Sequence, residues 1–368
     1  MHFFVDKKSF YESLNHFQSI VEKRNTIPIL ANIKISAKDN NVEITATDLS
    51  IQLSEKINAK ISEDGELTLP SQILFDIIKK IPDRNSIEIK SNKDTGKVFI
   101  LFGKSKFSLS SLPANDFPEI DSENLSIKMI LSSDDLKYLL DECKFSMGSD
   151  ESRQYLNGIY FHKEDKKVIT VATDGHRLSK CEIHIDESIP DFDGIIIPKK
   201  TVNEISKLLE DKEDSINIEL SKTKIKFDFG NLNLISKLVN SNFPDYVSVI
   251  PKANNLEMQC DSNCFYETID RVSTISNEKF RTVKLEISEN TCTVSSFGEE
   301  NSIGTEQISV RYEGTKININ FNARYIMDVL SILKNQDLSI SFAEDTAPTI
   351  IRSKSKPNSL YLIMQMRA

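Results

Sequence analysis

Asp174 and His176 are the residues of this sequence that come closest to an acid–base pair. A carboxylate two residues from an imidazole could move protons near neutral pH. However, a similar loop occurs 126 residues earlier with Asp48 and Ser50, where no histidine is present. We therefore interpret the segment as a repeated structural turn that carries a histidine in one copy, and we expect no catalytic residues.

The sequence also gives little support for a metal site or a cofactor site. The five cysteines form no Cys-x-x-Cys pair, and no histidine follows Cys260 and Cys264 at the spacing of a zinc site. The chain has only 11 glycines and no glycine-rich phosphate loop. We expect no metal and no cofactor. The low, odd number of cysteines favours a reduced, cytoplasmic location without disulfides.

Composition excludes several classes of protein. The net charge of −9 over 368 residues argues against a protein whose whole surface grips nucleic acid, although a local basic track remains possible. No apolar run approaches the ~18 residues of a membrane span, and the first residues lack the pattern of a secretion signal. The length predicts two or three domains.

The segments on either side of the Asp48 and Asp174 loops belong to a pattern that occurs three times in the sequence. One apolar pattern steps by 4, 3 and 4 residues, at Phe10, Leu14, Phe17 and Val21; at Leu136, Leu140, Cys143 and Met147; and at Phe265, Ile269, Val272 and Ser276. A second repeats at Leu74, Ile77, Ile78 and Ile81; at Val202, Ile205, Ser206 and Leu209; and at Ile326, Val329, Leu330 and Leu333. Both predict amphipathic helices, in the segments 6–24, 71–84, 132–153, 199–212, 261–281 and 322–334.

Short alternating segments separated by turn residues lie between these helices and predict antiparallel strands. We therefore predict an α+β chain of three repeated domains, each with two helices and antiparallel sheets. The offsets place the domains at 1–125, 126–253 and 254–368.

Several motifs occur together: 155–158 (Tyr-Leu-Asn-Gly), 173–178 (Thr-Asp-Gly-His-Arg-Leu), 243–246 (Phe-Pro-Asp-Tyr), 276–281 (Ser-Asn-Glu-Lys-Phe-Arg) and the end of the chain from 361 to 368. In this combination the chain resembles, over its full length, the bacterial sliding clamp family, the beta subunit of DNA polymerase III. The resemblance implies DNA-clamp domains and a ring-shaped head-to-tail homodimer that encircles duplex DNA, slides along it regardless of sequence and tethers polymerases for processivity.

The resemblance also implies a non-catalytic subunit, with nucleotidyltransferase activity in other subunits. Its partners would be the DNA polymerase III catalytic subunit, a clamp loader, and other DNA polymerases and repair proteins that carry clamp-binding peptides. No membrane is involved.

Charge in the helical segments is compatible with sliding. Their formal charges sum to about zero, so the remainder of the chain carries the acidic excess. A weak, sequence-blind attraction to phosphates suits a protein that must glide. The expected DNA-binding residues are Arg24, Arg153, Gln154 and Tyr155, by resemblance, and the helix lysines Lys79, Lys80, Lys199 and Lys200. Gln154 replaces a common aromatic, and each lysine could instead belong to an ordinary solvated helix face.

The end of the chain suggests a partner pocket. Leu360, Leu362, Met364 and Met366 alternate so close to the terminus that they are hard to cover, and Met suits a surface with several partners. Alternatively, the two methionines fill the core of the third domain.

By resemblance these residues form a pocket for a short peptide with a leucine-and-phenylalanine anchor. One subsite would contain Leu156, Thr173, Gly175, His176, Arg177, Leu178, Pro244, Val249 and Leu362. The adjoining subsite would contain Arg153, Tyr155, Phe280, Asn322, Tyr325, Thr346, Met364, Met366 and Arg367. Gln365, Ser248 and Ala368 depart from the usual family residues.

The resemblance places the dimer interface at Phe107 and Leu109 of one protomer, facing Thr274 and Ile275 of the other. Thr274 replaces a more apolar residue, and Phe107 and Leu109 could instead face their own core. Two other functions stay open: a small-molecule enzyme that uses Asp174 and His176 in a cleft, and a repeat-built protein-interaction adaptor without DNA encirclement.

Overall fold

The computed structural model describes residues 1–22, 26–83, 86–92, 95–185, 189–210, 215–276, 281–343 and 347–366. The predicted site residues Arg24, Phe280, Thr346 and Arg367 lie outside these ranges, as does Ala368. The chain forms two compact units, one of Met1–Ser133 with Lys207–Leu238 and the other of Asp134–Ser206 with Val239–Ala368. The chain passes from one unit to the other at three places, all inside the second predicted repeat, and each unit is described by itself below.

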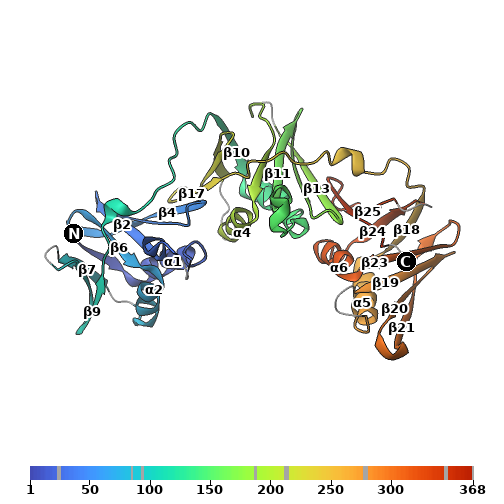
Figure 1. Cartoon of the computed structure of the whole chain (residues 1–368), viewed down its shortest axis with the longest axis horizontal. Coiled ribbons are helices and arrows are strands. Elements are labelled where there is room, and N and C mark those ends of the chain that lie inside the picture. Colours follow the sequence, from blue (N-terminus) through green and yellow to red (C-terminus); the bar gives the residue numbers. More distant parts are fainter. Residues whose placement is uncertain are drawn as a thin grey trace. The chain divides into compact units, whose positions relative to one another are not determined.

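A similar order of elements occurs three times, with one strand fewer between the helices of the second repeat (Figure 1). The first repeat contains β1 (His2–Asp6), α1 (Lys7–His16), β2 (Asn32–Lys38), β3 (Asn41–Thr47), β4 (Ile51–Asn58), β5 (Lys60–Glu63), β6 (Gly65–Pro70), α2 (Ser71–Lys80), β7 (Ser86–Asn92), β8 (Lys97–Phe102) and β9 (Ser105–Ser110). The second contains β10 (Ile127–Ser132), α3 (Ser133–Asp141), β11 (Gly158–Glu164), β12 (Lys167–Thr173), β13 (Arg177–His184), β14 (Ile195–Pro198), α4 (Lys199–Leu208), β15 (Ser215–Leu220), β16 (Lys224–Asp228) and β17 (Leu232–Lys237).

The third repeat contains β18 (Leu256–Asp261), α5 (Ser262–Ser273), β19 (Thr282–Ser288), β20 (Thr291–Phe297), β21 (Ile303–Ser309), β22 (Arg311–Tyr312), β23 (Ile317–Asn322), α6 (Ala323–Ile332), β24 (Asp337–Phe342), β25 (Thr349–Ser353) and β26 (Ser359–Ile363). The prediction of three repeats, each with two helices and antiparallel strands, is confirmed.

The repeats share their sheets. In the first unit, β17 of the second repeat pairs with β4 of the first, which produces an eight-stranded sheet in the order β10-β15-β16-β17-β4-β3-β2-β6. In the second unit, β26 of the third repeat pairs with β13 of the second, within a sheet of order β14-β11-β12-β13-β26-β25-β24-β18-β22. Each joint therefore unites the final strand of one repeat with the strand after the central loop of the repeat before it.

Two smaller sheets end in strands with a single neighbour among the described residues. The order β5-β1-β7-β8-β9 leaves β9 at an edge, and the order β21-β20-β19-β23 leaves β21 at an edge. These are the final strand of the first repeat and the strand after the central loop of the third.

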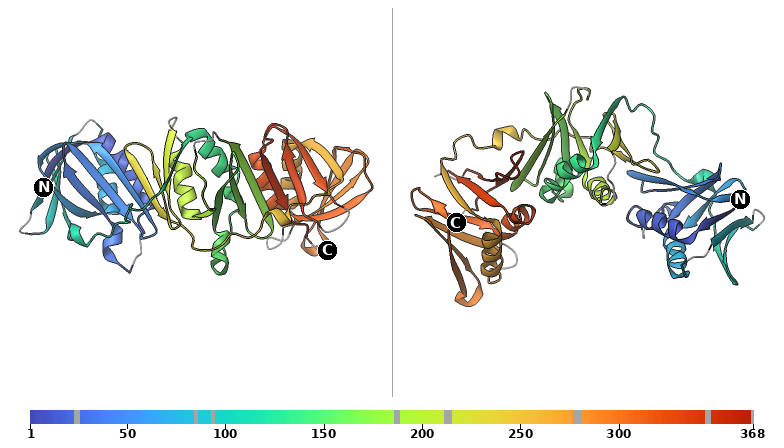
Figure 2. Two further views of the ribbon diagram at one scale, coloured as in Figure 1. Left: turned by 90° about the horizontal axis from the view of Figure 1, so that it is seen from above. Right: turned by 180° about the vertical axis from the view of Figure 1, so that it is seen from behind.

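Short polar side chains cap the first helix of the first repeat and of the third. Asp6 accepts a hydrogen bond from the Ser9 backbone amide before α1, and Asp261 accepts one from the Cys264 amide at the equivalent place before α5. Within their repeats α1 packs on α2 and α5 packs on α6, and both pairs are visible in Figure 2.

The helices are shorter than predicted, although their apolar faces were placed well. The first helix ends at His16, and Phe17 begins a 3₁₀ turn that buries Ile20 where Val21 was predicted. The third ends at Asp141, yet Leu136, Leu140, Cys143 and Met147 are all buried. Tight turns thus continue the apolar face after the α-helical hydrogen bonds end.

All five cysteines are free, and four of them are buried. Cys260 is buried while Cys264 is exposed, so the two do not form one ligand pair, and no metal-binding group of three was found among the described residues. No helix in the described part of the chain is both long enough and apolar enough to cross a membrane.

Candidate functional site

The loop between β12 and β13 is a turn held by its own side chains. The Asp174 carboxylate accepts hydrogen bonds from the backbone amides of His176 (2.9 Å) and Arg177 (3.1 Å). The Thr173 hydroxyl donates to the Arg177 carbonyl (2.6 Å) and accepts from the Gly175 amide (3.1 Å). Gly175 has φ of +90°, a conformation that glycine adopts without strain.

The first repeat contains the same turn. Asp48 accepts from the amides of Ser50 and Ile51 (2.8 Å each), and the Thr47 hydroxyl donates to the Ile51 carbonyl (2.9 Å). The Asp174 carboxylate is therefore occupied by backbone amides, as is that of Asp48 in a turn without a histidine. This arrangement favours a structural turn over the small-molecule enzyme that we considered from the sequence.

Arg177 connects this turn to the third repeat. Its Nε donates to Asp174 (3.0 Å), its Nη2 donates to the Phe145 carbonyl (2.6 Å), and its Nη1 pairs with Asp328 on α6. The guanidinium also lies over the Tyr325 ring, 4.7 Å from its centroid. A planar cation with this many partners fixes the position of the loop relative to α6.

A cavity of about 280 Å³ opens beside the turn, in the second unit. Its walls come from the 3₁₀ turn Glu151–Leu156, from β13, from the end of β26 and from the segment 243–249. The lining residues are Arg153, Tyr155, Leu156, Thr173, Gly175, Arg177, Leu178, Phe243, Pro244, Asp245, Tyr246, Val249, Pro348, Leu362 and Met364.

The cavity is apolar inside and charged at its rim. A buried cluster of Ile169, Val171, Leu178, Tyr246, Ile350, Leu360 and Leu362 lies beneath it. At the rim, Arg153 donates to Asp150 (3.0 Å), and Asp245 accepts from the Val247 amide (3.1 Å). The Ser152 hydroxyl and amide, with Arg153, hold the pKa of Asp150 below its ordinary value. Such a cavity suits an apolar side chain whose backbone meets polar groups at the entrance.

Most of the predicted pocket residues come together here. Arg153, Tyr155, Leu156, Thr173, Gly175, Arg177, Leu178, Pro244, Val249, Leu362 and Met364 all line the cavity. His176 and Tyr325 line a smaller, neighbouring cavity of about 180 Å³, where their rings stack with centroids 6.2 Å apart. Asn322 instead caps α6 by accepting from the Arg324 amide (3.0 Å).

The end of the chain departs from the predicted strand. β26 ends at Ile363, after which Met364 donates its amide to the His176 carbonyl (2.8 Å) and Met366 forms a bridge with Asn320. Met364 is 42% exposed, so it does not fill the core of the third repeat. Met366 is half-buried and accepts a weak hydrogen bond at its sulfur from Thr282 (3.8 Å).

Sequence reasoning missed four lining residues: Phe243, Asp245, Tyr246 and Pro348. Phe243, Asp245 and Tyr246 belong to the Phe-Pro-Asp-Tyr segment that supports the family resemblance, so that segment was a usable signal for them. Pro348 had no signal in the sequence.

The predicted DNA-binding lysines occupy helix ends. Lys79 and Lys80 are exposed in the last turn of α2, in the first unit. Lys199 and Lys200 begin α4 and are half-buried, and Lys199 donates to the Gly148 carbonyl (3.2 Å). Gln154 is exposed in the 3₁₀ turn beside the cavity.

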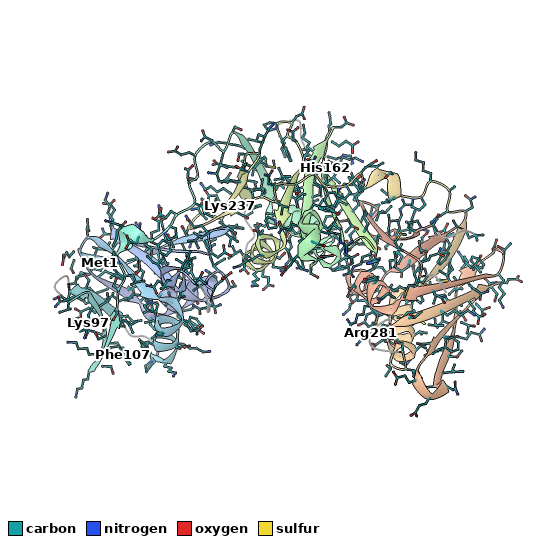
Figure 3. The ribbon with its side chains drawn as sticks, viewed as in Figure 1. Met1, Lys97, Phe107, His162, Lys237 and Arg281 are labelled. Atoms are coloured by element: carbon teal, nitrogen blue, oxygen red, sulfur yellow. The ribbon has the colours of Figure 1, made fainter. Side chains whose placement is uncertain are left out.

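The predicted interface residues lie on or beside the edge strands β9 and β21. Phe107, labelled in Figure 3, is 40% exposed on β9, while Leu109 on the same strand is half-buried. Thr274 and Ile275 follow α5, where Ile275 touches the turn between β20 and β21 so closely that a Cβ on Gly298 would lie 2.3 Å from the Ile275 carbonyl oxygen. Phe297 and Ile303, which the sequence did not single out, pair across that turn and are the most exposed apolar residues of this region.

Comparison with known proteins accounts for the whole chain. Family models of the DNA polymerase III beta subunit match its N-terminal domain at residues 1–121, its central domain at 130–245 and its C-terminal domain at 247–367. The beta sliding clamp of Caulobacter vibrioides is 35% identical over 367 residues, covering 99% of each chain. That of Rickettsia felis is 36% identical over 377 residues, covering 99% of this chain and 98% of the relative.

Solved structures agree. A crystal structure of the sliding clamp from Bartonella birtlesii bound to griselimycin superposes with a TM-score of 0.97 at 36% identity, covering all of both chains. Matches to each of the three domains, in order and over the full length, show that this chain belongs to the DNA polymerase III beta subunit family, the bacterial sliding clamps.

Proposed function

We propose that this protein acts as the sliding clamp of DNA polymerase III by forming a head-to-tail homodimeric ring around duplex DNA, with a peptide pocket that recruits its partners. In this role it enhances processivity and carries no active site, and the nucleotidyltransferase activity belongs to other subunits. The domains would be 1–125, 126–253 and 254–368.

The pairing of strands between successive repeats is the observation that supports a ring. Within the chain, β17 pairs with β4 and β26 pairs with β13, so a final strand joins the strand after the central loop of the preceding repeat. By the same rule β9 should join β21, and within one chain these strands are not partners among the described residues. A second copy would satisfy both open edges, head to tail, and an exposed strand edge favours such pairing.

Side chains at the two edges are complementary. Phe107 and Leu109 on β9 would face Ile275, Phe297 and Ile303 of the other copy. Lys104 and Lys106 flank Phe107, whereas Glu299 and Glu300 lie between Phe297 and Ile303. Apolar contact would supply affinity, and opposite charges would fix the orientation.

DNA would be held by enclosure rather than by tight binding. The proposed contacts are Arg24, Arg153, Gln154, Tyr155, Lys79, Lys80, Lys199 and Lys200, which are few for a chain with a net charge of −9. A small number of phosphate contacts gives weak, salt-sensitive and sequence-independent attraction, as sliding requires.

The cavity next to the Asp174 turn would receive a leucine or phenylalanine anchor from a partner peptide. Its proposed members are Arg153, Tyr155, Leu156, Thr173, Gly175, His176, Arg177, Leu178, Pro244, Val249, Phe280, Asn322, Tyr325, Thr346, Leu362, Met364, Met366 and Arg367. We propose that griselimycin, bound by the Bartonella birtlesii clamp, also binds here. The polymerase catalytic subunit, the clamp loader, other polymerases and repair proteins would compete for this site.

The test of enclosure is release on linearisation. The protein is loaded by a clamp loader and ATP onto a nicked circular plasmid, excess protein is removed by gel filtration, and half of the sample is cut once by a restriction enzyme. We expect co-elution with the circle and release from the linear form. Equal retention on both forms would show adhesion instead, and no retention on the circle would favour an adaptor without DNA encirclement.

The pocket is tested with a fluorescently labelled peptide that carries the leucine and phenylalanine anchor. Deleting residues 364–368 should abolish peptide binding and leave the dimer intact in sedimentation. Unchanged peptide affinity after the deletion would remove the pocket assignment.

A further inference from the structure

The segment 243–249 forms one wall of the pocket but has little regular structure of its own. It lies between β17 and β18, and its only helical part is the 3₁₀ turn Val247–Val249. Phe243, Tyr246 and Val249 all line the cavity. Since Val249 is 48% exposed, the position of this wall must depend on how Phe243 and Tyr246 are anchored.

A stack of aromatic rings on β11 anchors the wall from behind. The Phe243 ring lies parallel to that of Tyr160, with centroids 4.8 Å apart and planes 1° apart. Tyr160 in turn stacks on His162, with centroids also 4.8 Å apart. His162, labelled in Figure 3, and Tyr160 are two residues apart on one strand and therefore project from the same face of the sheet.

His162 also contacts the wall directly. Its Nε2 lies 3.1 Å from the hydroxyl oxygen of the buried Tyr246. Burial raises the pKa of Tyr246 to about 12, so the hydroxyl keeps its proton and can donate. Burial lowers the pKa of His162, so its ring is neutral near pH 7 and can accept.

Backbone also lies against Tyr160. A Cβ on Gly194 would lie 2.1 Å from the Tyr160 hydroxyl oxygen, so the loop before β14 leaves room for this tyrosine only because residue 194 is glycine. Tyr160 is thus in contact with Gly194, Phe243 and His162, and these three neighbours restrict its movement.

We propose that His162 is a positioning residue for partner binding, which holds the wall 243–249 in its binding conformation through its contacts with Tyr246 and Tyr160. The inference rests on the proposed peptide pocket and deepens it, because His162 itself does not line the cavity. The ligand class is a short peptide with an apolar anchor.

Protonation of the His162 ring changes its contact with Tyr246. A protonated imidazole carries hydrogen on both nitrogens, so the Tyr246 hydroxyl can no longer donate to it and would have to turn and accept, while burial disfavours the charged ring. Glu164 on β11 favours the protonated form, and Lys180 on β13 disfavours it; Tyr160 and Tyr246 face the ring as neutral groups. Because burial lowers the pKa of His162, the hydrogen bond from Tyr246 to the neutral ring is intact at neutral pH, and protonation as the pH falls through the lowered pKa removes it and favours opening of the wall.

The experiment measures the affinity of a fluorescently labelled peptide with a leucine and phenylalanine anchor at about pH 7.5 and at lower pH, in steps down to about pH 4, with griselimycin as competitor. Wild type should bind ~3- to 10-fold more weakly at lower pH, the effect of losing one hydrogen bond. His162→Gln should be insensitive to this pH change, since its amide oxygen accepts without titrating. His162→Leu should bind at neutral pH as weakly as wild type does at low pH.

Two controls isolate His162. The exposed His184 on β13 provides a matched substitution, His184→Gln, which should behave like wild type. His176, in the neighbouring cavity, is present in every variant, so the difference between wild type and His162→Gln reports on His162 alone.

The inference is overturned if His162→Gln shows the pH dependence of wild type, or if His162→Leu binds as tightly as wild type at every pH. If wild type fails to bind the peptide and griselimycin at neutral pH, the pocket assignment under the proposed function fails instead, so the two failures are distinguishable.

Discussion

The hydroxyl of Tyr361 on β26 donates a hydrogen bond to the carboxylate of Glu142, which is buried just beyond the end of α3. Lys356 pairs with the same carboxylate and also donates to the Ile332 carbonyl (3.1 Å) at the end of α6. Residues of the second and third repeats thus share one buried carboxylate behind the strand whose Leu362 lines the pocket.

Glu142→Leu should destabilise the second unit. The substitution leaves the Tyr361 hydroxyl and the Lys356 ammonium without their shared acceptor, and breaking a buried charge network costs about 3 kcal/mol. Urea unfolding followed by tyrosine fluorescence measures the loss, since the chain has nine tyrosines and no tryptophan. The exposed Glu313 provides the control, Glu313→Leu, which should change stability by less than about 0.5 kcal/mol. Equal unfolding midpoints for both variants would contradict this role of Glu142.

The two equivalent aspartate turns allow a matched comparison. Asp174→Ala removes the acceptor of two backbone amides and of Arg177, so we expect about tenfold weaker binding of the labelled peptide. Asp48→Ala removes the same backbone contacts in the first unit and should leave peptide affinity unchanged. Fluorescence anisotropy measures both affinities. A similar loss in the two variants would mean that the effect is general and not due to the pocket.

Ile303→Asp should weaken the homodimer. The residue is 61% exposed on the edge strand β21, and a charge placed in an apolar interface costs about 2 kcal/mol, or roughly 30-fold in the dissociation constant. Sedimentation velocity over a concentration series measures this constant. Ile130→Asp is the control, because Ile130 is equally exposed on β10, outside the proposed interface. Dimers of unchanged strength in Ile303→Asp would place the interface elsewhere.

Glu182 should make stability depend on pH. Burial alone would raise its pKa, but hydrogen bonds and charge from Lys167 and Lys180 hold the pKa below the ordinary value. A carboxylate with a lowered pKa contributes stability above its unfolded value of about 4.5, and this contribution disappears as the pH falls through the folded pKa.

Glu182→Gln should therefore be less stable than wild type by about 0.5–1 kcal/mol near pH 7, with solvent screening included. Melting temperatures measured by circular dichroism should converge as the pH falls through the lowered pKa of Glu182. A difference that persists at low pH would show that packing, and not the ion pairs, is responsible.

Much of the fold was predictable because its periodicity is strong. The spacing of Phe265, Ile269 and Val272 predicted a buried helix face, and those residues are buried on α5. Helix ends were not predictable from this pattern, since Phe17 continues the apolar face of α1 in a 3₁₀ turn. Sharing of sheets between repeats was not foreseen either, because strand pairing across a joint depends on edges that no local pattern describes.

The pocket was predictable only in part, and the family resemblance contributed most of it. Alternation predicted that Met364 and Met366 share a face, but the strand ends at Ile363 and the two side chains separate. Phe243 and Tyr246 were overlooked as lining residues because an aromatic side chain in a loop gives no periodic signal. Their stacking on β11 depends on a contact between residues about eighty positions apart.

The sharing of β17 by the first unit has a consequence for synthesis on the ribosome. That unit includes residues 207–238, so it cannot be complete when residue 133 leaves the ribosome. One edge of β4 stays unpaired while more than seventy further residues are synthesised. Those intervening residues belong to the other unit, which is complete only after the C-terminal part of the chain has been synthesised. Nascent chains of this protein therefore expose unpaired strands until translation is nearly finished. We expect chaperone binding during synthesis, and the rate of elongation through 134–206, to affect folding more here than in a chain of independently folding domains.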